Sequence, residues 1–153
     1  MTKDKMIYLA YGSNLNKDQM SRRCPKAEPM GWINLPDYRL VFKGVADIIP
    51  AKGMTVPVGL WRITEECEEA LDRYEGFPNL YRKQYWQAKD GQQFMAYVMN
   101  GYDISTPAKS YFDGIKQGYH DFGIDTAPLY EALDVSTKKD TDDGYVPMRY
   151  RTT

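Results

Sequence analysis

The order in which strand-like and helix-like segments follow one another constrains the fold of this chain most strongly. Runs rich in apolar, β-branched and aromatic residues predict strands at Met6–Ala10, Trp32–Leu35, Tyr38–Phe42, Val45–Ile49 and Val56–Ile63, and a hairpin of Tyr81–Lys89 with Gln93–Met99 around Asp90-Gly91. Helices are predicted over Asn16–Arg23, Thr64–Glu75, Ala108–Phe122 and Ala127–Leu133. A doubly wound parallel sheet would need regular alternation of the two types. The pattern instead predicts an α+β fold, a small mixed or antiparallel β-barrel surrounded by helices.

Capping signals mark the ends of two predicted helices. Asn16, with Gln19 three residues later, approximates a capping box at the start of the first helix. The helix Thr64–Glu75 is followed by Gly76 and Pro78, a common way for a helix to end. Its apolar stripe consists of Cys67, Ala70, Leu71 and Tyr74.

Length and composition fit one globular domain over residues 1–153, with its core in about residues 6–135. Hydrophobic residues make up 42% of the chain, enough for a packed interior. Residues 136–153 are predicted to form a polar tail, in which Tyr145–Arg151 either adds an edge strand or stays irregular. No particular oligomeric state is predicted.

Charge and hydropathy argue against two classes of partner. The net charge is −1, from 20 basic and 21 acidic residues, and no cluster of Lys and Arg could follow a phosphate backbone, so nucleic acid is not expected. No apolar run approaches the roughly 20 residues of a membrane span. Because Met1–Lys5 leads into a strand without the apolar stretch of a signal peptide, a cytoplasmic protein is predicted.

The sequence lacks the residues of several common catalytic sites. It has no GxxxxGK[ST] phosphate loop, no GxGxxG, no HExxH and no GxSxG. Its one histidine, His120, fits a surface or capping position better than a Ser–His or Cys–His pair. Cys24, Cys67 and His120 lie far apart in the sequence, so a zinc site is not expected.

The first segment that could carry chemistry is Tyr8-Leu9-Ala10-Tyr11-Gly12-Ser13-Asn14-Leu15, where a strand leads into a helix. We expect Gly12 to adopt a backbone conformation that other residues avoid. Backbone N–H groups and the side chains of Ser13 and Asn14 would then face outward at a helix start, an arrangement that binds anions such as a carboxylate. An ordinary strand–turn–helix with a good cap is the alternative interpretation.

The second segment is Leu71–Tyr81, in which Glu75 closes a helix. The negative end of the helix dipole and any burial both disfavour an ionised carboxylate. Both effects would raise the pKa of Glu75 toward neutrality, where a carboxyl group carries protons best. On helix geometry alone, Glu75 could equally be solvated. The other acids of the helix are expected on its solvated face: Glu66, Glu68, Glu69 and Asp72.

Together the two segments resemble the γ-glutamylcyclotransferase family, which includes γ-glutamylamine cyclotransferases and avirulence-induced-like proteins. The specific part of the likeness is Tyr-Gly-Ser-Asn after a first strand, followed by Leu71-Asp72 and Glu75-Gly76. Further matches extend over most of residues 6–135: Val58-Gly59-Leu60-Trp61, Met99-Asn100-Gly101-Tyr102, Pro107–Gly118, Gly123-Ile124 and the last helix through Tyr130 and Leu133. The resemblance implies that family's fold, a small β-barrel with helices around it.

By this resemblance Glu75 is the catalytic acid/base, and the substrate is a small γ-glutamyl compound. The resemblance also implies the residues that bind the substrate: Tyr8, Leu9, Ala10, Tyr11, Gly12, Ser13 and Asn14, with Tyr111 as the family's pocket tyrosine and Tyr81 as a second pocket hydroxyl. The reaction that the resemblance implies is an attack of the substrate's α-amine on the γ-carbonyl of the same glutamyl group, which releases 5-oxoproline and a free amine; an enzyme of this type is classed as an acyltransferase or lyase. Because the substrate supplies the nucleophile, no enzyme nucleophile or cofactor is needed.

Two other functions stay open. A non-catalytic protein could hold a small ligand in the same pocket, although a buried acid facing an anionic ligand is useful mainly for proton transfer. A cysteine amidohydrolase would use Cys24 or Cys67, which lack an evident partner base. The sequence does not specify the group attached to the glutamyl moiety, and residues 43–56 and 77–85 are expected to select it.

Overall fold

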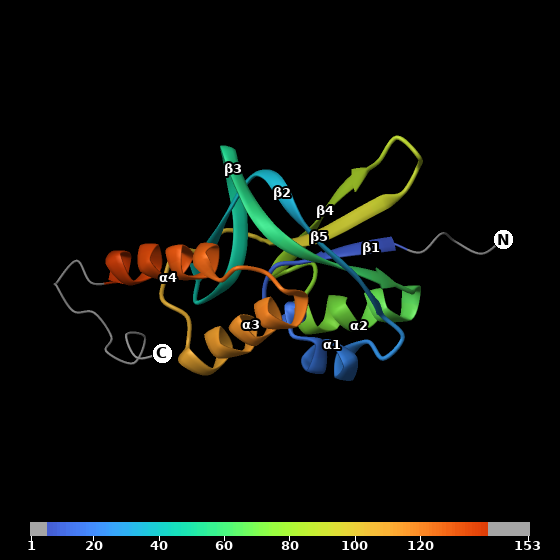
Figure 1. Ribbon diagram of the computed structural model, residues 1–153, viewed down its shortest axis with the longest axis horizontal. Coiled ribbons are helices and arrows are strands. Elements are labelled where there is room, and N and C mark those ends of the chain that lie inside the picture. Colours follow the sequence, from blue (N-terminus) through green and yellow to red (C-terminus); the bar gives the residue numbers. More distant parts are fainter. Residues whose placement is uncertain (1–5, 141–153) are drawn as a thin grey trace.

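The computed structural model describes residues 6–140, which form a curved sheet with helices packed against it (Figure 1). The strands are β1 (Met6–Ala10), β2 (Glu28–Lys43), β3 (Val45–Ile63), β4 (Tyr81–Gln87) and β5 (Gln93–Met99). The helices are α1 (Lys17–Arg23), α2 (Glu65–Glu75), α3 (Lys109–Phe122) and α4 (Ala127–Asp140), with a short 3-10 turn, η1 (Ser13–Leu15), between β1 and α1. The predicted α+β class is confirmed.

The sheet is mixed, with the strand order β2-β3-β1-β5-β4. The central strand β1 pairs antiparallel with β3 and parallel with β5. Within residues 6–140 no ladder joins the outer strands β2 and β4, so the sheet is roughly barrel-like but not closed. The outer strand β2 instead lies against α4 (Figure 1).

Two long strands replace the four short ones predicted between residues 32 and 63. They form one antiparallel ladder, and the chain turns from β2 into β3 at Gly44. The φ of Gly44 is 80°, a value that glycine adopts readily. The prolines of this region do not interrupt the ladder. Pro36, on the outer strand β2, lies where the register shifts next to Asp37, which has a φ of 63°.

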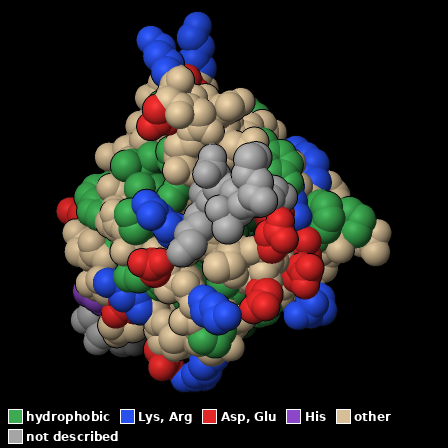
Figure 2. Space-filling view, turned by 90° about the vertical axis from the view of Figure 1, so that its right-hand side faces the viewer, with side chains coloured by type: hydrophobic (Ala, Val, Ile, Leu, Met, Phe, Trp, Pro, Cys, Tyr) green, Lys and Arg blue, Asp and Glu red, His purple; other side chains and the backbone are tan. Residues whose placement is uncertain are grey.

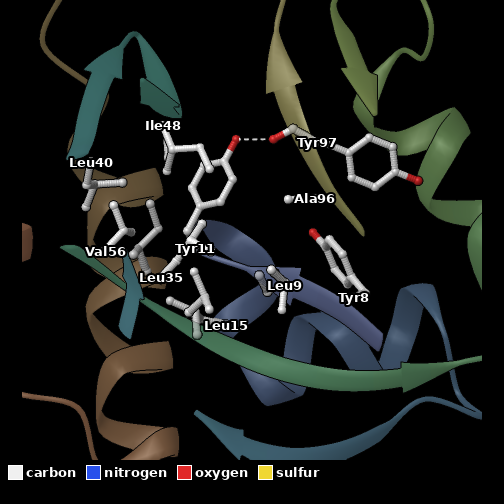
Figure 3. Close-up of a cluster of buried hydrophobic side chains, with 14 of the residues drawn as sticks. Tyr8, Leu9, Tyr11, Leu15, Leu35, Leu40, Ile48, Val56, Ala96 and Tyr97 are labelled. Atoms are coloured by element: carbon white, nitrogen blue, oxygen red, sulfur yellow. Dashed lines mark hydrogen bonds between the residues drawn. The ribbon is translucent and has the colours of Figure 1, made fainter. Parts of the chain in front are cut away.

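Strand β1 runs through the middle of the hydrophobic core. Its residues from Ile7 to Ala10 are buried. Figure 3 shows Leu9 and Leu15 beside an apolar cluster that includes Leu35 and Val56 from the β2–β3 ladder. Strand β1 is paired with β3 on one edge and β5 on the other, and its side chains from Ile7 to Ala10 are buried. The position of the segment that follows β1 toward η1 is therefore well defined.

Helix α3 packs directly against η1 through a glycine. A Cβ atom on Gly118 would lie 2.5 Å from the carbonyl carbon of Leu15 and 2.6 Å from the nitrogen of Asn16. The Asn16 side chain also donates a hydrogen bond from Nδ2 to the carbonyl of Gly114, at 3.0 Å. The predicted cap of α1 is confirmed, since Asn16 Oδ1 accepts from the backbone N–H of Gln19 at 2.9 Å.

Helix α4 is longer than predicted. It continues to Asp140, so that residues 136–140 belong to the helix and not to a polar tail. Ser136 and Thr137 are buried, and their hydroxyls donate to the helix carbonyls of Leu133 and Asp134. Such back-bonding lets hydroxyl residues lie inside a helix, which their polarity alone does not suggest. The segment Tyr145–Arg151 lies outside the described residues.

Charged side chains of both signs are interspersed with apolar ones over the described part of the face shown in Figure 2. None of the helices within residues 6–140 has the length and apolar character needed to cross a bilayer.

Candidate active site

A cavity of about 210 Å³ lies where β1 leads into η1, next to the C-terminal end of α2. Pockets for drug-sized ligands are roughly 300–1,000 Å³, so this cavity suits a group about as large as one amino acid. Its walls come from β1, η1, α2, α3 and the strands β3–β5. The lining residues are Tyr8, Tyr11, Gly12, Ser13, Asn14, Val45, Ala46, Tyr74, Glu75, Leu80, Tyr81, Tyr97 and Tyr111.

The turn at Gly12 is tight for a different reason than the sequence suggested. Its φ of −118° is outside the left-handed region, so the expected special backbone conformation is not what requires glycine. The requirement is close approach, since a Cβ atom would lie 3.2 Å from Ala46 Cβ and 3.4 Å from the Tyr111 hydroxyl. A side chain at this position would therefore require Ala46 to shift by a few tenths of an ångström.

The turn η1 has backbone N–H groups that no other backbone group uses, on two residues that line the cavity. The first hydrogen bonds of the turn are donated by Leu15 and Asn16. The N–H groups of Ser13 and Asn14 therefore have no backbone partner among residues 6–140, as is usual at the start of a helical turn. Trp61 Nε1 fixes the turn by donating to the Asn14 carbonyl at 2.9 Å.

Glu75 is brought to the cavity by α2, whose two ends are well defined. Thr64 caps the start by accepting a hydrogen bond from the Cys67 N–H, and Gly76, with a φ of 64°, ends the helix as predicted. The Glu75 carboxyl group is partly buried, and its Oε1 lies 3.4 Å from Asn14 Nδ2, a long hydrogen bond.

Burial raises the pKa of Glu75 to about 7, although the positive charge of Arg23 pulls it down. The sequence predicted a rise through both burial and the helix dipole, and burial is the main cause in the structure. Near neutral pH both protonation states of Glu75 are populated, as a group that accepts and returns protons requires.

Two tyrosine hydroxyls are held by the two backbone groups of one residue, Ala46. The Tyr81 hydroxyl donates to the Ala46 carbonyl at 2.8 Å, while the Tyr111 hydroxyl accepts from the Ala46 N–H at 2.9 Å. Tyr111 therefore keeps its own O–H hydrogen for a ligand oxygen, whereas Tyr81 keeps lone pairs for a ligand N–H. Burial raises the pKa of both phenols, so they stay neutral at physiological pH.

Tyr8 and Tyr11, from the first segment, also differ in whether the hydroxyl donates or accepts a hydrogen bond. The Tyr11 hydroxyl donates to the Tyr97 carbonyl at 2.6 Å (Figure 3), and the Tyr8 hydroxyl accepts from Asn14 Nδ2 at 2.9 Å. Burial raises the pKa of Tyr8 and Tyr11 well above 10, so neither is charged near pH 7. Donors and acceptors thus surround the cavity, and Glu75 is the ionisable group poised near neutrality.

The structure brings eight of the ten predicted site residues to the cavity. They are Tyr8, Tyr11, Gly12, Ser13, Asn14, Glu75, Tyr81 and Tyr111. The other two, Leu9 and Ala10, do not line it, because their side chains are buried in the core (Figure 3 shows Leu9). The period of two along a strand explains part of this: Leu9 must face away from its neighbour Tyr8.

Sequence reasoning missed several lining residues. Val45, Ala46 and Leu80 fall within the ranges 43–56 and 77–85 that were expected to shape selectivity, but none was singled out. Tyr74 was assigned to the apolar stripe of α2, yet 44% of it is exposed and its hydroxyl lies 3.0 Å from Ser13 Oγ. A phenol next to a predicted catalytic acid was the available signal.

Two acids of α2 are not solvated as predicted. Lys83 Nζ bridges Glu68 at 2.7 Å and Asp72 at 2.9 Å, and these three side chains are largely covered. Asp72 Oδ1 also accepts a hydrogen bond from the hydroxyl of Tyr97 at 2.6 Å. The bridge ties α2 to the β4–β5 hairpin, which sequence spacing within the helix could not reveal.

The cysteine alternative finds no support in the geometry. Cys24 and Cys67 are buried and do not line the cavity, and burial raises the pKa of Cys24 to about 12, so its reactive thiolate is scarce. His120 is exposed near the end of α3. Within residues 6–140 no three His, Cys, Asp or Glu side chains gather as a metal site would need.

Comparison with known proteins points to one family. Residues 8–119 match the sequence profile of the family described as "Gamma-glutamyl cyclotransferase, AIG2-like". A solved structure named "Gamma-glutamyl cyclotransferase" has a TM-score of 0.75 at 22% identity, covering 97% of this chain and 96% of that chain. No protein of curated function matches the chain in sequence.

Two further solved structures share the fold. One is a Homo sapiens protein described as uncharacterized, with a TM-score of 0.72 at 22% identity over 95% of this chain and 93% of that chain. The other is an AIG2-like protein from Mus musculus, with a TM-score of 0.54 at 19% identity over 71% of this chain and 83% of that chain. At these identities the likeness concerns the fold.

Proposed function

The chain belongs to the γ-glutamyl cyclotransferase, AIG2-like family, and from this premise we propose that it converts a small γ-glutamyl compound into 5-oxoproline and a free amine. In this proposal Glu75 is the general acid/base, and the substrate's own α-amine is the nucleophile. The observation that carries it is one carboxyl group, with a pKa of about 7, in the same cavity as the backbone donors of Ser13 and Asn14.

The substrate supplies most of its own reactivity. The α-nitrogen and the γ-carbonyl carbon of a glutamyl group can close a five-membered ring, so holding the chain folded turns the attack into a favourable intramolecular step. A new bond forms between the α-nitrogen and the γ-carbon, and the bond from that carbon to the departing nitrogen breaks. A cavity that fits one amino acid would enforce the folded conformation.

The number of protons lost by the α-nitrogen equals the number gained by the departing nitrogen, so one acid/base suffices. The α-nitrogen begins as an ammonium with three protons and ends as a lactam N–H, so it gives up two. The departing nitrogen gains two when it leaves as an ammonium. Glu75 can carry these protons one at a time, because near neutral pH its two protonation states are close in free energy.

The remaining groups of the cavity suit the rest of the substrate. The N–H groups of Ser13 and Asn14 have no backbone partner within residues 6–140 and belong to residues that line the cavity, so we assign them the glutamyl α-carboxylate or the oxygen that becomes negative as the ring closes. The free O–H hydrogen of Tyr111 is a further donor to a substrate oxygen. Tyr81, which can still accept, is assigned to the N–H side of the ligand.

A panel of γ-glutamyl compounds tests the proposal. The panel contains γ-glutamyl amino acids, γ-glutamylamines including isopeptides, and glutamylated biosynthetic intermediates, and release of 5-oxoproline is measured by mass spectrometry. We expect release from at least one class, and release that survives alkylation of the two thiols. Calorimetric binding is measured in parallel for every compound.

The parallel measurement separates the remaining alternative. If compounds bind but no 5-oxoproline appears, the protein is a binding module and the catalytic proposal is wrong. If no compound of the panel binds or reacts, the γ-glutamyl assignment itself is wrong.

A further inference from the structure

Arg23, the last residue of α1, does not line the cavity, yet it contacts the cavity walls. Its Nη1 donates to Asn14 Oδ1 at 2.6 Å, and its Nη2 donates to Gln19 Oε1 at 2.9 Å. Its guanidinium carbon also lies 3.7 Å from the centre of the Tyr74 ring. One side chain from α1 thus touches both η1 and α2, the two elements that carry the proposed substrate loop and the proposed acid.

The contact with Asn14 determines which way its amide faces. A guanidinium group can only donate, so it must meet the oxygen of the amide and not the nitrogen. The Nδ2 end is then directed at the Tyr8 hydroxyl, 2.9 Å away, and at Glu75 Oε1, 3.4 Å away. With the amide reversed, its oxygen would face the Glu75 carboxylate, and two acceptors would repel each other.

The contact with Tyr74 holds one wall of the cavity. A guanidinium plane over an aromatic ring is a favourable arrangement, and it keeps the ring in one orientation. Tyr74 otherwise reaches the turn η1 through its hydroxyl, 3.0 Å from Ser13 Oγ. Because Tyr74 is 44% exposed, the stacked Arg23 supplies packing that the core does not.

We propose that Arg23 is a positioning residue of this site, which orients the Asn14 amide toward Glu75, holds the Tyr74 ring and supplies a positive charge to the Glu75 carboxylate. The inference rests on the proposed function in that it gives Glu75 the role of proton carrier. It acts through Asn14 and Tyr74, and it does not require Arg23 to touch the substrate.

Electrostatics agrees with the geometry. The charge of Arg23 lowers the pKa of Glu75, against the rise caused by burial. Four phenols, from β1, the Gly12 turn, β4 and α3, have a pKa that the charge of Glu75 helps to raise; they are Tyr8, Tyr11, Tyr81 and Tyr111. Burial raises the pKa of each of these phenols, so they are neutral near pH 7. Within residues 6–140, Arg23 is thus the charge that tunes Glu75.

The test titrates Glu75 directly. Carbon-13-labelled glutamate reports the carboxyl titration by NMR, and the Glu75 signal is assigned by its loss in Glu75→Gln. In Arg23→Met, which keeps a stem of similar length, we expect the midpoint to move to higher pH. Arg22→Met is the matched control, because Arg22 is the exposed neighbour on the same helix, paired with Asp18. Its midpoint should stay at the wild-type value.

The same variants separate charge from hydrogen bonding. Arg23→Lys keeps the charge but loses the planar fork, so we expect a near-normal midpoint together with shifted Asn14 side-chain amide signals. At neutral pH, kcat/KM should fall about tenfold in Arg23→Met, less than the roughly 10²–10⁴-fold contribution of a general acid/base itself. Arg23→Lys should recover part of that loss.

The outcomes are distinguishable from a failure of the proposed function. An unmoved Glu75 midpoint in a folded Arg23→Met overturns the inference. If Arg23→Met does not fold, unchanged Asn14 amide signals in Arg23→Lys overturn it instead. Because the titration needs no turnover, a shifted midpoint in a protein that releases no 5-oxoproline would support the role of Arg23 and reject the catalytic proposal.

Discussion

The two ends of helix α2 treat glutamate in opposite ways. At the N-terminal end Thr64 caps the helix, and Glu65 and Glu66 lie exposed in the first turn, where negative charge meets the positive end of the helix dipole. At the C-terminal end Glu75 lies partly buried in the cavity, and burial raises its pKa to about 7. The same type of side chain therefore stabilises the first turn of the helix, whereas its charged form is unfavourable in the last turn.

This contrast shows where stability and function diverge within a single element. The first turn follows the local preferences of a helix, and the exposed positions of Glu65 and Glu66 agree with them. The last turn violates those preferences at one position, and the violation gives a carboxyl group that can exchange protons near neutrality. The predictions below break or sharpen this contrast.

The largest effect is expected from removing the acid at the C-terminal end. Glu75→Gln keeps the shape of the side chain but cannot carry protons, so we expect release of 5-oxoproline to fall by roughly 10²–10⁴-fold with ligand binding retained. Glu69→Gln is the matched control, since it removes the same charge from an exposed position of the same helix. Turnover of Glu75→Gln at the wild-type rate would remove Glu75 from the mechanism.

The same substitution should stabilise the protein at alkaline pH. Because the folded-state pKa of Glu75 is raised from 4.5 to about 7, the native protein binds an extra proton between these values, and stability falls as pH rises through that window. A glutamine at position 75 cannot ionise, so Glu75→Gln does not lose stability over this pH range. We expect a gain on the order of 1–3 kcal/mol at about pH 8 and little or none at about pH 5, measured by urea unfolding. A gain of equal size at both pH values would contradict the assigned cause.

At the other end, loss of the cap should affect stability without changing the chemistry. Thr64→Ala removes the acceptor for the Cys67 N–H and should cost about 1 kcal/mol of unfolding free energy. Thr64→Ser, which keeps the hydroxyl, serves as the control and should recover most of the loss. The pH at which kcat/KM is half-maximal should match the wild type, and a displaced profile would mean that the two ends are coupled.

The smallest effect is expected from an exposed acid of the first turn. Glu66→Gln removes a favourable dipole interaction and a loose ion pair with Lys26, at 3.8 Å, both exposed. We expect a loss of a few tenths of a kcal/mol, measured by thermal unfolding. High salt should abolish it, and a loss that persists in salt would show that the side chain contributes packing instead of charge.

The parts of this protein that are set by neighbours in sequence were predictable. The start of α1 at Asn16, the end of α2 at Gly76 and the hairpin at Asp90-Gly91 each follow from a few adjacent residues, and the structure has all three. The meeting of the Gly12 turn with Glu75 was not visible in spacing, and it was expected from resemblance to a family. The structure brings both segments to one cavity.

Features that depend on distant contacts were missed. Pro36 and Asp37 are accommodated inside one long strand because β3 pairs with Pro36 and again with Tyr38 beyond the register shift, and no local sequence signal indicates that. Position 12 has little room for a side chain because Ala46 and Tyr111 approach it, and both are far away in the chain. The role of Arg23 is of the same kind, since its partners on η1 and α2 come together only in the folded protein.

The contact at Gly118 has a consequence for how this protein tolerates change. The helix backbone there touches the loop that starts at Gly12 with no room for a methyl group, although the two segments are about a hundred residues apart. In a saturation library scored by activity, position 118 should behave like a lining position, intolerant even of alanine, while touching no ligand. A map of activity loss on substitution along the chain would therefore mark residues that pack behind the cavity as strongly as residues that line it.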